Sequence, residues 1–91
     1  MLESKLKIIN PLGLHARAAA QLVRLAGKFQ SKIILARTDN NVVADAKSIL
    51  SVLTLAAAKG TQLEINVEGA DESEAFQAIC EIFADGFGEI S

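Results

Sequence analysis

Residues 62–68 of the chain read Gln-Leu-Glu-Ile-Asn-Val-Glu, and they carry the clearest strand pattern in the sequence. The apolar residues Leu63, Ile65 and Val67 alternate with polar ones, which is the period of a strand that buries one of its two faces. A Gly-Ala dipeptide follows and ends the pattern. This segment therefore predicts a sheet with one face in a core and the other face lined by polar side chains.

Three shorter segments predict the remaining strands. Leu6 and Ile8 alternate with lysines, as in a half-buried strand. Residues 33–37 predict a second strand, although three consecutive apolar residues leave its inward face open. Residues 42–44 predict a third strand, because the Asp-Asn-Asn turn at 39–41 would join the two as a hairpin.

Two longer segments predict helices. Apolar residues at helical spacing indicate a helix over residues 16–28. Its expected inward residues are Ala19, Leu22, Val23, Ala26 and Phe29. The last helix should begin after Asp71, which stands three residues before Glu74 as in a capping box, and should end at Gly86 and Gly88. Its expected inward residues are Ala75, Ile79, Ile82 and Phe83.

A short central helix is expected to begin at Ser48, since serine is a natural N-cap. Its polar stripe, at i, i+4 and i+7, comprises Lys47, Ser51 and Thr54. Its expected inward residues are Ile49, Val52, Leu53 and Ala56. Leu50 falls on the polar side, either as an ordinary exposed leucine or as an apolar anchor for a partner protein, and the spacing leaves both open.

The order of these elements is β-α-β-β-α-β-α. Short connections and one-faced helices favour an α+β fold, an open-faced β-sandwich in which three helices cover one face of a four-stranded antiparallel sheet. The length of 91 residues suits a single domain spanning 1–91, which we expect to be monomeric.

Composition argues against several classes of protein. The longest apolar stretch, 52–58, is too short to cross a bilayer, and no secretory leader precedes the first strand. We therefore expect a cytoplasmic protein with no membrane insertion. The single cysteine, Cys80, rules out an internal disulfide and is expected to be a small packed side chain in the last helix. The usual clustered metal ligands are missing from the sequence, so we expect no metal.

The charges are unevenly distributed, although their formal sum is only −2. All nine Lys and Arg residues lie at or before Lys59, with three acids, whereas eight acids and no base follow. This asymmetry predicts an electropositive region near His15 and Arg17, suited to an acidic protein partner. Nucleic acid fits less well, because the sequence pI is about 5.3 and no stripe of aromatic and basic residues is present.

The only histidine, His15, stands at the head of the first predicted helix, within Asn-Pro-Leu-Gly-Leu-His-Ala-Arg at 10–17. Unpaired N–H groups at a helix N-terminus attract anions, so the amides of Ala16, Arg17 and Ala18 could receive phosphate oxygens. The Arg17 guanidinium could bind the same group. These residues predict a transient phosphohistidine at His15; the alternative is a capping or turn histidine with no chemistry.

The sequence resembles the HPr family, the phosphocarrier proteins of the bacterial phosphotransferase system. The resemblance rests on Gly-Leu-His-Ala-Arg at 13–17, Lys-Ser-Ile at 47–49 and Ala-Lys-Gly at 58–60, and it covers essentially the whole chain. It implies that Nδ1 of His15 receives the phosphoryl group from enzyme I, charged by phosphoenolpyruvate, and passes it to IIA domains. Since the chain has no Walker-type loop, we expect no cofactor and a carrier rather than a free-standing enzyme.

The resemblance also implies roles for the central helix. The family docks its partners through this helix and the histidine loop, which makes Lys47, Leu50, Ser51 and Thr54 the expected docking residues. It makes Ser48 a regulatory phosphorylation site for an HPr kinase/phosphatase, although N-capping alone would explain a serine there.

The competing interpretation is a non-catalytic regulatory docking module of the same fold, acting through Ser48 alone. Retention of both His15 and Arg17 argues against it, since docking needs neither. Three positions depart from the family pattern: Ala18 replaces a proline, Leu50 a methionine and Ser51 a glycine. Proline would fix φ in the first helical turn, so Ala18 loosens that turn slightly, while the other two changes bear on partner choice.

Overall fold

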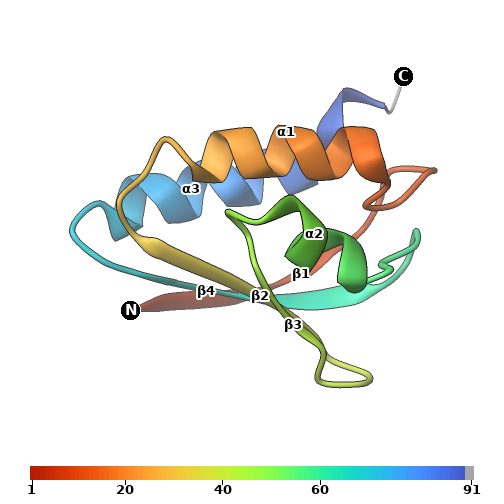
Figure 1. Ribbon diagram of the computed structural model, residues 1–91, viewed down its shortest axis with the longest axis horizontal. Coiled ribbons are helices and arrows are strands. Elements are labelled where there is room, and N and C mark those ends of the chain that lie inside the picture. Colours follow the sequence, from red (N-terminus) through yellow and green to blue (C-terminus); the bar gives the residue numbers. More distant parts are fainter. Residues whose placement is uncertain (90–91) are drawn as a thin grey trace.

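The structure is a computed structural model that describes residues 1–89 (Figure 1). Within these residues the elements follow the predicted order, with a final 3₁₀ turn added. They are β1 (Leu2–Lys7), α1 (Ala16–Ala26), β2 (Lys32–Arg37), β3 (Val43–Asp45), α2 (Ile49–Thr54), β4 (Gln62–Glu68), α3 (Glu72–Ala84) and η1 (Gly86–Gly88).

The strands form the predicted antiparallel sheet, in the order β1-β4-β2-β3. β4 lies inside the sheet, with Leu63 opposite Leu6 of β1 and Ile65 opposite Leu35 of β2. The apolar residues of β4 are fully buried, as their alternation predicts, because every second side chain faces the core. In β2 it is Ile33 and Leu35 that face the core, which resolves the face that the sequence left open.

The three α-helices cover the same face of the sheet, so the fold is the predicted open-faced sandwich (Figure 1). The buried cluster between the two layers includes Leu22 of α1, Ile79 and Phe83 of α3, and the inner residues of β4. α1 contacts both α2 and α3. Because α1 and α3 run in opposite directions, the beginning of α1 and the end of α3 lie at the same end of the molecule (Figure 1).

α1 ends at Ala26, two residues before the predicted end. Beyond it, Lys28 N–H donates to the Leu25 carbonyl at 3.1 Å and Phe29 N–H donates to the Ala26 carbonyl at 3.2 Å. These i→i−3 bonds tighten the chain into a 3₁₀-like turn, which is a common ending where glycine, here Gly27, weakens an α-helix. Phe29 nevertheless packs against the core, as expected.

The inward face predicted for the central helix is wrong for three of its four residues. α2 has six residues, and the buried side chains are Val52 and, just after the helix, Leu55. Ile49 and Leu53 are 40% and 37% exposed. Ala56 is also exposed, and its left-handed backbone (φ 48°) turns the chain away from the helix axis. A helix that stops this early cannot continue the predicted stripe.

The capping box predicted at Asp71 and Glu74 is also wrong. Asp71 precedes α3, but its carboxylate accepts hydrogen bonds from the N–H groups of Gln30 and Ser31, both at 2.9 Å, and from the Ser31 hydroxyl. These bonds, above all the one from the Ser31 hydroxyl, lower the pKa of Asp71. Asp71 therefore ties the loop after α1 to the start of α3 instead of capping the helix.

Candidate functional site

His15 occupies the N-cap position of α1, in agreement with the sequence. Its backbone is extended (φ −74°, ψ 177°), and its carbonyl accepts the first helical hydrogen bond, from Ala19 N–H at 2.8 Å. The N–H groups of Ala16, Arg17 and Ala18 therefore lie at the beginning of α1, where the helix itself offers them no hydrogen-bond acceptor. An anionic group beside His15 would meet these donors and the positive end of the helix dipole.

The loop that carries His15 is held by internal and tertiary hydrogen bonds. Asn10 is buried, and its Nδ2 donates to the Gly13 carbonyl at 2.8 Å. Leu14 N–H donates to the carbonyl of Ala57, just after α2, at 2.8 Å. Gly13 has a left-handed backbone (φ 66°), and a Cβ at this position would stand 2.5 Å from the Ala57 carbonyl oxygen. The loop therefore requires glycine at position 13.

His15 and Arg17 line the same cavity, of about 330 Å³, which lies between the beginning of α1 and the end of the described chain. The other residues that line it are Leu12, Gln21, Phe87, Gly88 and Glu89. The structure thus brings the predicted nucleophile, His15, and the predicted phosphate-binding guanidinium of Arg17 to one cavity. It also adds residues 87–89 to the site, whereas the sequence had suggested only that the glycines near them end the last helix.

Glu89 is the site residue that the sequence analysis missed. Its Oε2 lies 2.5 Å from Nε2 of His15, and its Oε1 accepts a hydrogen bond from Leu12 N–H at 3.4 Å. The hydrogen bond with His15 lowers the pKa of Glu89. Folding mixes the basic and acidic parts of the chain here, because it places the Glu89 carboxylate beside the residues that were expected to form an electropositive region. The sheet mixes them too, with Lys5 opposite Glu64.

A left-handed turn after α3 brings Glu89 to His15. Residues 86–88 all have positive φ, of 61°, 55° and 74°. Phe87 is buried, and its ring meets the ring of Phe83 edge-on with centroids 5.0 Å apart. The Gly-Phe-Gly sequence is the signal that could have located this turn, since glycine readily adopts left-handed backbone and an apolar residue between two glycines indicates an anchor.

Ser48 caps α2, as predicted, since its Oγ accepts a hydrogen bond from Ser51 N–H at 3.3 Å. The Ser51 Oγ in turn accepts from Asp45 N–H at 2.9 Å, which holds the cap against β3. Leu50 is 75% exposed, in agreement with its predicted place on the polar side. Because its apolar neighbours on α2 are partly exposed as well, the outer surface of this helix is more apolar than the sequence predicts.

Two other predicted docking residues are hydrogen-bonded within the domain. Lys47 is half-buried, and its Nζ donates to the Phe29 carbonyl at 2.7 Å. Its ammonium therefore holds the segment after α1 instead of extending into solvent. The Thr54 hydroxyl donates to the Ser51 carbonyl, and the Thr54 side chain remains exposed. The surface of α2 is therefore less basic than its sequence suggests.

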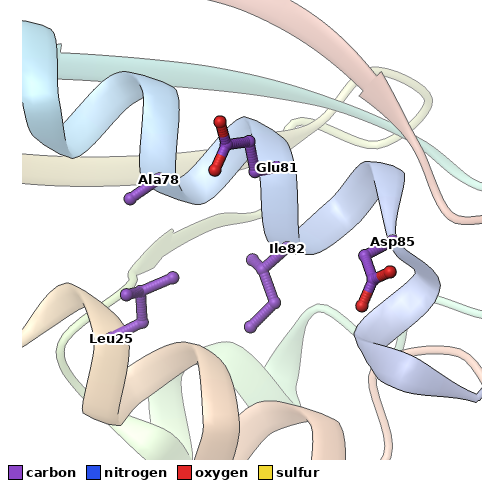
Figure 2. A pocket seen from close by; sticks show the side chains of 5 residues that line it. All are labelled: Leu25, Ala78, Glu81, Ile82 and Asp85. Atoms are coloured by element: carbon purple, nitrogen blue, oxygen red, sulfur yellow. The ribbon is translucent and has the colours of Figure 1, made fainter.

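A larger groove, of about 530 Å³, runs between α1 and α3 (Figure 2). It is lined by Leu25, Ala78, Glu81, Ile82 and Asp85. None of these side chains is a cation or a strong nucleophile, and none of the predicted site residues lines the groove. It is therefore separate from the cavity at His15.

The described part of the chain, residues 1–89, holds no group of three histidine, cysteine or acidic side chains placed to bind a metal ion. Within that same part, every helix is too short or too polar to cross a membrane. Cys80 is only partly buried on α3, and this burial raises the pKa of its thiol.

Similarity to known proteins runs along nearly the whole chain. Residues 2–85 match the family model of the PTS HPr component phosphorylation site. A phosphocarrier protein HPr of Xylella fastidiosa is 46% identical over 89 residues, which cover 98% of each chain. The crystal structure of HPr-C-His from Thermoanaerobacter tengcongensis is 36% identical, covers 100% of each chain and has a TM-score of 0.92. Fold and matches together define a phosphocarrier of the phosphotransferase system.

The chain belongs to the HPr family. A crystal structure of an HPr dimer from Thermoanaerobacter tengcongensis is 38% identical, covers 98% of this chain and 100% of that chain, and has a TM-score of 0.75. The monomeric state expected from the sequence therefore stays a prediction.

Proposed function

We propose that this protein accepts a phosphoryl group on His15 from enzyme I, charged by phosphoenolpyruvate, and passes it to IIA domains of sugar or regulatory permease systems. The observation that carries the proposal is the cavity at the N-terminal end of α1, which His15 and Arg17 line together. Membership of a family of phosphocarriers supports it. We also propose a cytoplasmic location and a monomeric state.

Transfer to His15 is a displacement at phosphorus. A ring nitrogen forms a bond to phosphorus with its lone pair, while the bond to the donor atom breaks and its electron pair leaves with the donor. Negative charge on the equatorial oxygens would then face the N–H groups of residues 16–18 and the Arg17 guanidinium. The same contacts serve the reverse step, in which the ring nitrogen is the leaving group.

Partners would dock on α2 and on the loop before α1. Leu50 and Leu12 are 75% and 68% exposed, and large exposed apolar side chains of this kind are common anchors in protein interfaces. The loop is hydrogen-bonded to the segment after α2, so one partner can cover both. Ser51 and Thr54 would belong to the polar rim. Lys47 would act mainly by supporting α1, because its ammonium binds the chain after that helix.

A second site, for regulation, is proposed at Ser48, with an HPr kinase/phosphatase as the modifying enzyme. Phosphate there would add about −1.5 to −2 charge beside the docking surface. That charge would repel an acidic partner. The alternative function is a non-catalytic docking module that works through Ser48 alone. The hydrogen bond that the Ser48 hydroxyl accepts from Ser51 N–H would explain a serine at this position even without any modification.

Labelling with enzyme I and radioactive phosphoenolpyruvate tests the proposal. We expect a single label, acid-labile and alkali-stable as a phosphoramidate is, and no label in a folded His15→Ala variant. Ser48→Ala is the matched control and should be labelled as the wild type is. Label in His15→Ala, or no label in the wild type, would overturn the proposal.

A further inference from the structure

We infer that Glu89 is a positioning residue for His15: it fixes the imidazole so that Nδ1 attacks phosphorus, and it stabilises the charge that the ring then carries. The inference rests on the proposed function, because it concerns the nucleophile of that reaction. Two observations carry it, namely the contact of the carboxylate with the ring and the backbone turn that produces this contact.

The contact holds both oxygens of the Glu89 carboxylate against the His15 loop. Oε2 lies 2.5 Å from Nε2 of His15, across 74 residues of sequence, and Oε1 accepts from Leu12 N–H at 3.4 Å. The side chains of His15 and Glu89 are 27% and 19% exposed, so water competes little for these positions. The imidazole thus has Nε2 engaged by Glu89, while Nδ1 has no hydrogen-bond partner among residues 1–89.

The backbone conformation of residues 86–88 costs more free energy than ending a helix requires. One left-handed glycine is enough to end a helix, yet here three successive residues are left-handed, and the middle one is phenylalanine (φ 55°). A bulky residue keeps such a conformation only where its surroundings enforce it, and Phe87 is held by burial and by Phe83. The strained backbone is explained if its role is to deliver Glu89 to the ring.

The carboxylate decides which ring nitrogen is the nucleophile. An ionised carboxylate can only accept hydrogen bonds, so a neutral imidazole must place its proton on Nε2 and its lone pair on Nδ1. A glutamate carboxyl is ionised at neutral pH, and the hydrogen bond with His15 lowers the pKa of Glu89 further. The buried aspartate of serine protease triads orients its histidine by the same logic.

The same carboxylate stabilises the phosphorylated ring. When the bond from Nδ1 to phosphorus forms and the donor bond breaks, the ring keeps its Nε2 proton and becomes cationic. Glu89 then faces a positive ring and strengthens the hydrogen bond that was present before transfer. In the reverse step the protonated ring is the better leaving group, so Glu89 would assist both halves of the carrier cycle.

An opposite role is physically possible, because a carboxylate beside the cavity also repels an incoming phosphoryl group. If repulsion dominated, removal of Glu89 would speed transfer; if positioning dominates, removal slows it. The contact favours positioning, since the carboxylate lies at Nε2 and leaves Nδ1 free. The sign of the change in rate therefore decides between the two.

The test compares Glu89→Ala and Glu89→Gln with the wild type, and uses Glu74→Gln, an exposed acid at the other end of α3, as the matched control. Single-turnover transfer from phosphorylated enzyme I should slow about 10- to 100-fold in both Glu89 variants, the usual effect of losing a hydrogen bond to a charged group, while KM changes less than about twofold. Glu74→Gln should match the wild type. Thermal melts establish that each variant is folded.

The tautomer is read directly from ¹H–¹⁵N spectra of the His15 ring at a pH where it is neutral. We expect the wild type to carry its proton on Nε2. The share with the proton on Nδ1 should rise in Glu89→Ala and rise less in Glu89→Gln, whose amide oxygen can still accept a hydrogen bond from Nε2–H. Unchanged or faster transfer in Glu89→Ala, or an unchanged tautomer in both variants, would overturn the inference while leaving His15 as the labelled residue. Loss of label in the wild type would instead overturn the proposed function.

Discussion

Leu14 and Ala57 join the two parts of the proposed docking surface through one backbone hydrogen bond of 2.8 Å. Leu14 directly precedes His15, the proposed nucleophile, and Ala57 lies three residues after α2. Because the bond is between backbone groups, it does not depend on which side chains recognise the partner. The loop and the docking helix therefore keep a fixed relative position, and a partner bound to α2 meets His15 at a defined place.

Gly13→Ala should weaken this junction. The new Cβ would meet the Ala57 carbonyl oxygen at 2.5 Å and Ala58 Cα at 2.9 Å, on a backbone with φ of +66°. We expect a loss of about 2–4 kcal/mol in the free energy of unfolding, measured by urea denaturation. Gly60→Ala, which is also left-handed (φ +92°) but faces open space, is the control and should lose only about 1–2 kcal/mol. Equal losses of stability in the two variants would mean that the loop at residue 13 can shift away from the Ala57 carbonyl.

Arg17→Ala should slow phosphoryl transfer without a matching loss of docking. A charge-assisted contact to a desolvated phosphoryl group accounts for roughly tens- to several-hundredfold in rate. Stopped-flow transfer and a separate binding measurement give the two effects. Arg24→Ala removes another exposed arginine from the same helix and should leave transfer near the wild-type rate. Weaker docking with normal transfer would assign Arg17 to partner recognition instead.

Leu50→Ala should weaken binding of enzyme I while leaving the fold intact. The side chain is 75% exposed, so we expect a change in stability below about 0.5 kcal/mol. The loss of binding should vary little with salt, because the contact removed is apolar. Leu55→Ala is the matched leucine, at 1% exposure, and should cost about 2–5 kcal/mol of stability. Normal binding by Leu50→Ala would remove it from the docking surface.

Ser48→Asp imitates a negative charge at the cap of α2. Aspartate is itself a good N-cap, so the melting temperature should stay near that of the wild type. Association with an acidic partner should be slower, and the defect should shrink with added salt, which screens exposed charges over roughly 8–10 Å near physiological ionic strength. Transfer measured at two salt concentrations tests this. Normal transfer at low salt would leave Ser48 with a capping role alone.

Asp71 should make stability depend on acidic pH. Its pKa is lowered from the ordinary value of 3.8 by the Ser31 hydroxyl first and then by the Gln30 amide, so the unfolded chain binds its proton more tightly than the folded one. The stability from Asp71 is thus present above its ordinary pKa and is lost as pH falls through the folded value. Urea denaturation at pH 3 and pH 6 should show a smaller difference in the free energy of unfolding between the two pH values for Asp71→Asn than for the wild type.

Local periodicity predicted most of the fold because it depends on neighbours in sequence. The alternation around Ile65 and the spacing of Leu22 in α1 reflect burial of one face, and both side chains are fully buried. The same reasoning misplaced Ile49 and Leu53, because a six-residue helix held by two buried positions leaves its other apolar residues outside. Pattern alone does not reveal where such a helix stops.

Part of the candidate site could not be predicted for a different reason. His15 and Arg17 are two residues apart on one helix end, so their cooperation is visible in sequence. Glu89 reaches His15 across 74 residues, through a turn whose left-handed geometry includes a phenylalanine. Its contact depends on the antiparallel arrangement of α1 and α3, which is a property of the assembled fold. For the same reason, the charge asymmetry of the sequence could not show that an acid of the C-terminal part would lie beside His15.

The position of β1 at the edge of the sheet has a consequence for how the protein is made. Its sole neighbour in the strand order is β4, with Leu6 opposite Leu63, and Ile8 N–H just beyond it donates to the Thr61 carbonyl at 2.9 Å. During synthesis, β1 and the loop after it emerge before β4, so they cannot be fixed in the sheet until residues 62–68 have followed. Contacts of such long sequence separation form slowly, in milliseconds to seconds for folds dominated by them. A nascent chain therefore carries His15 well before the proposed phosphoryl site around it can form.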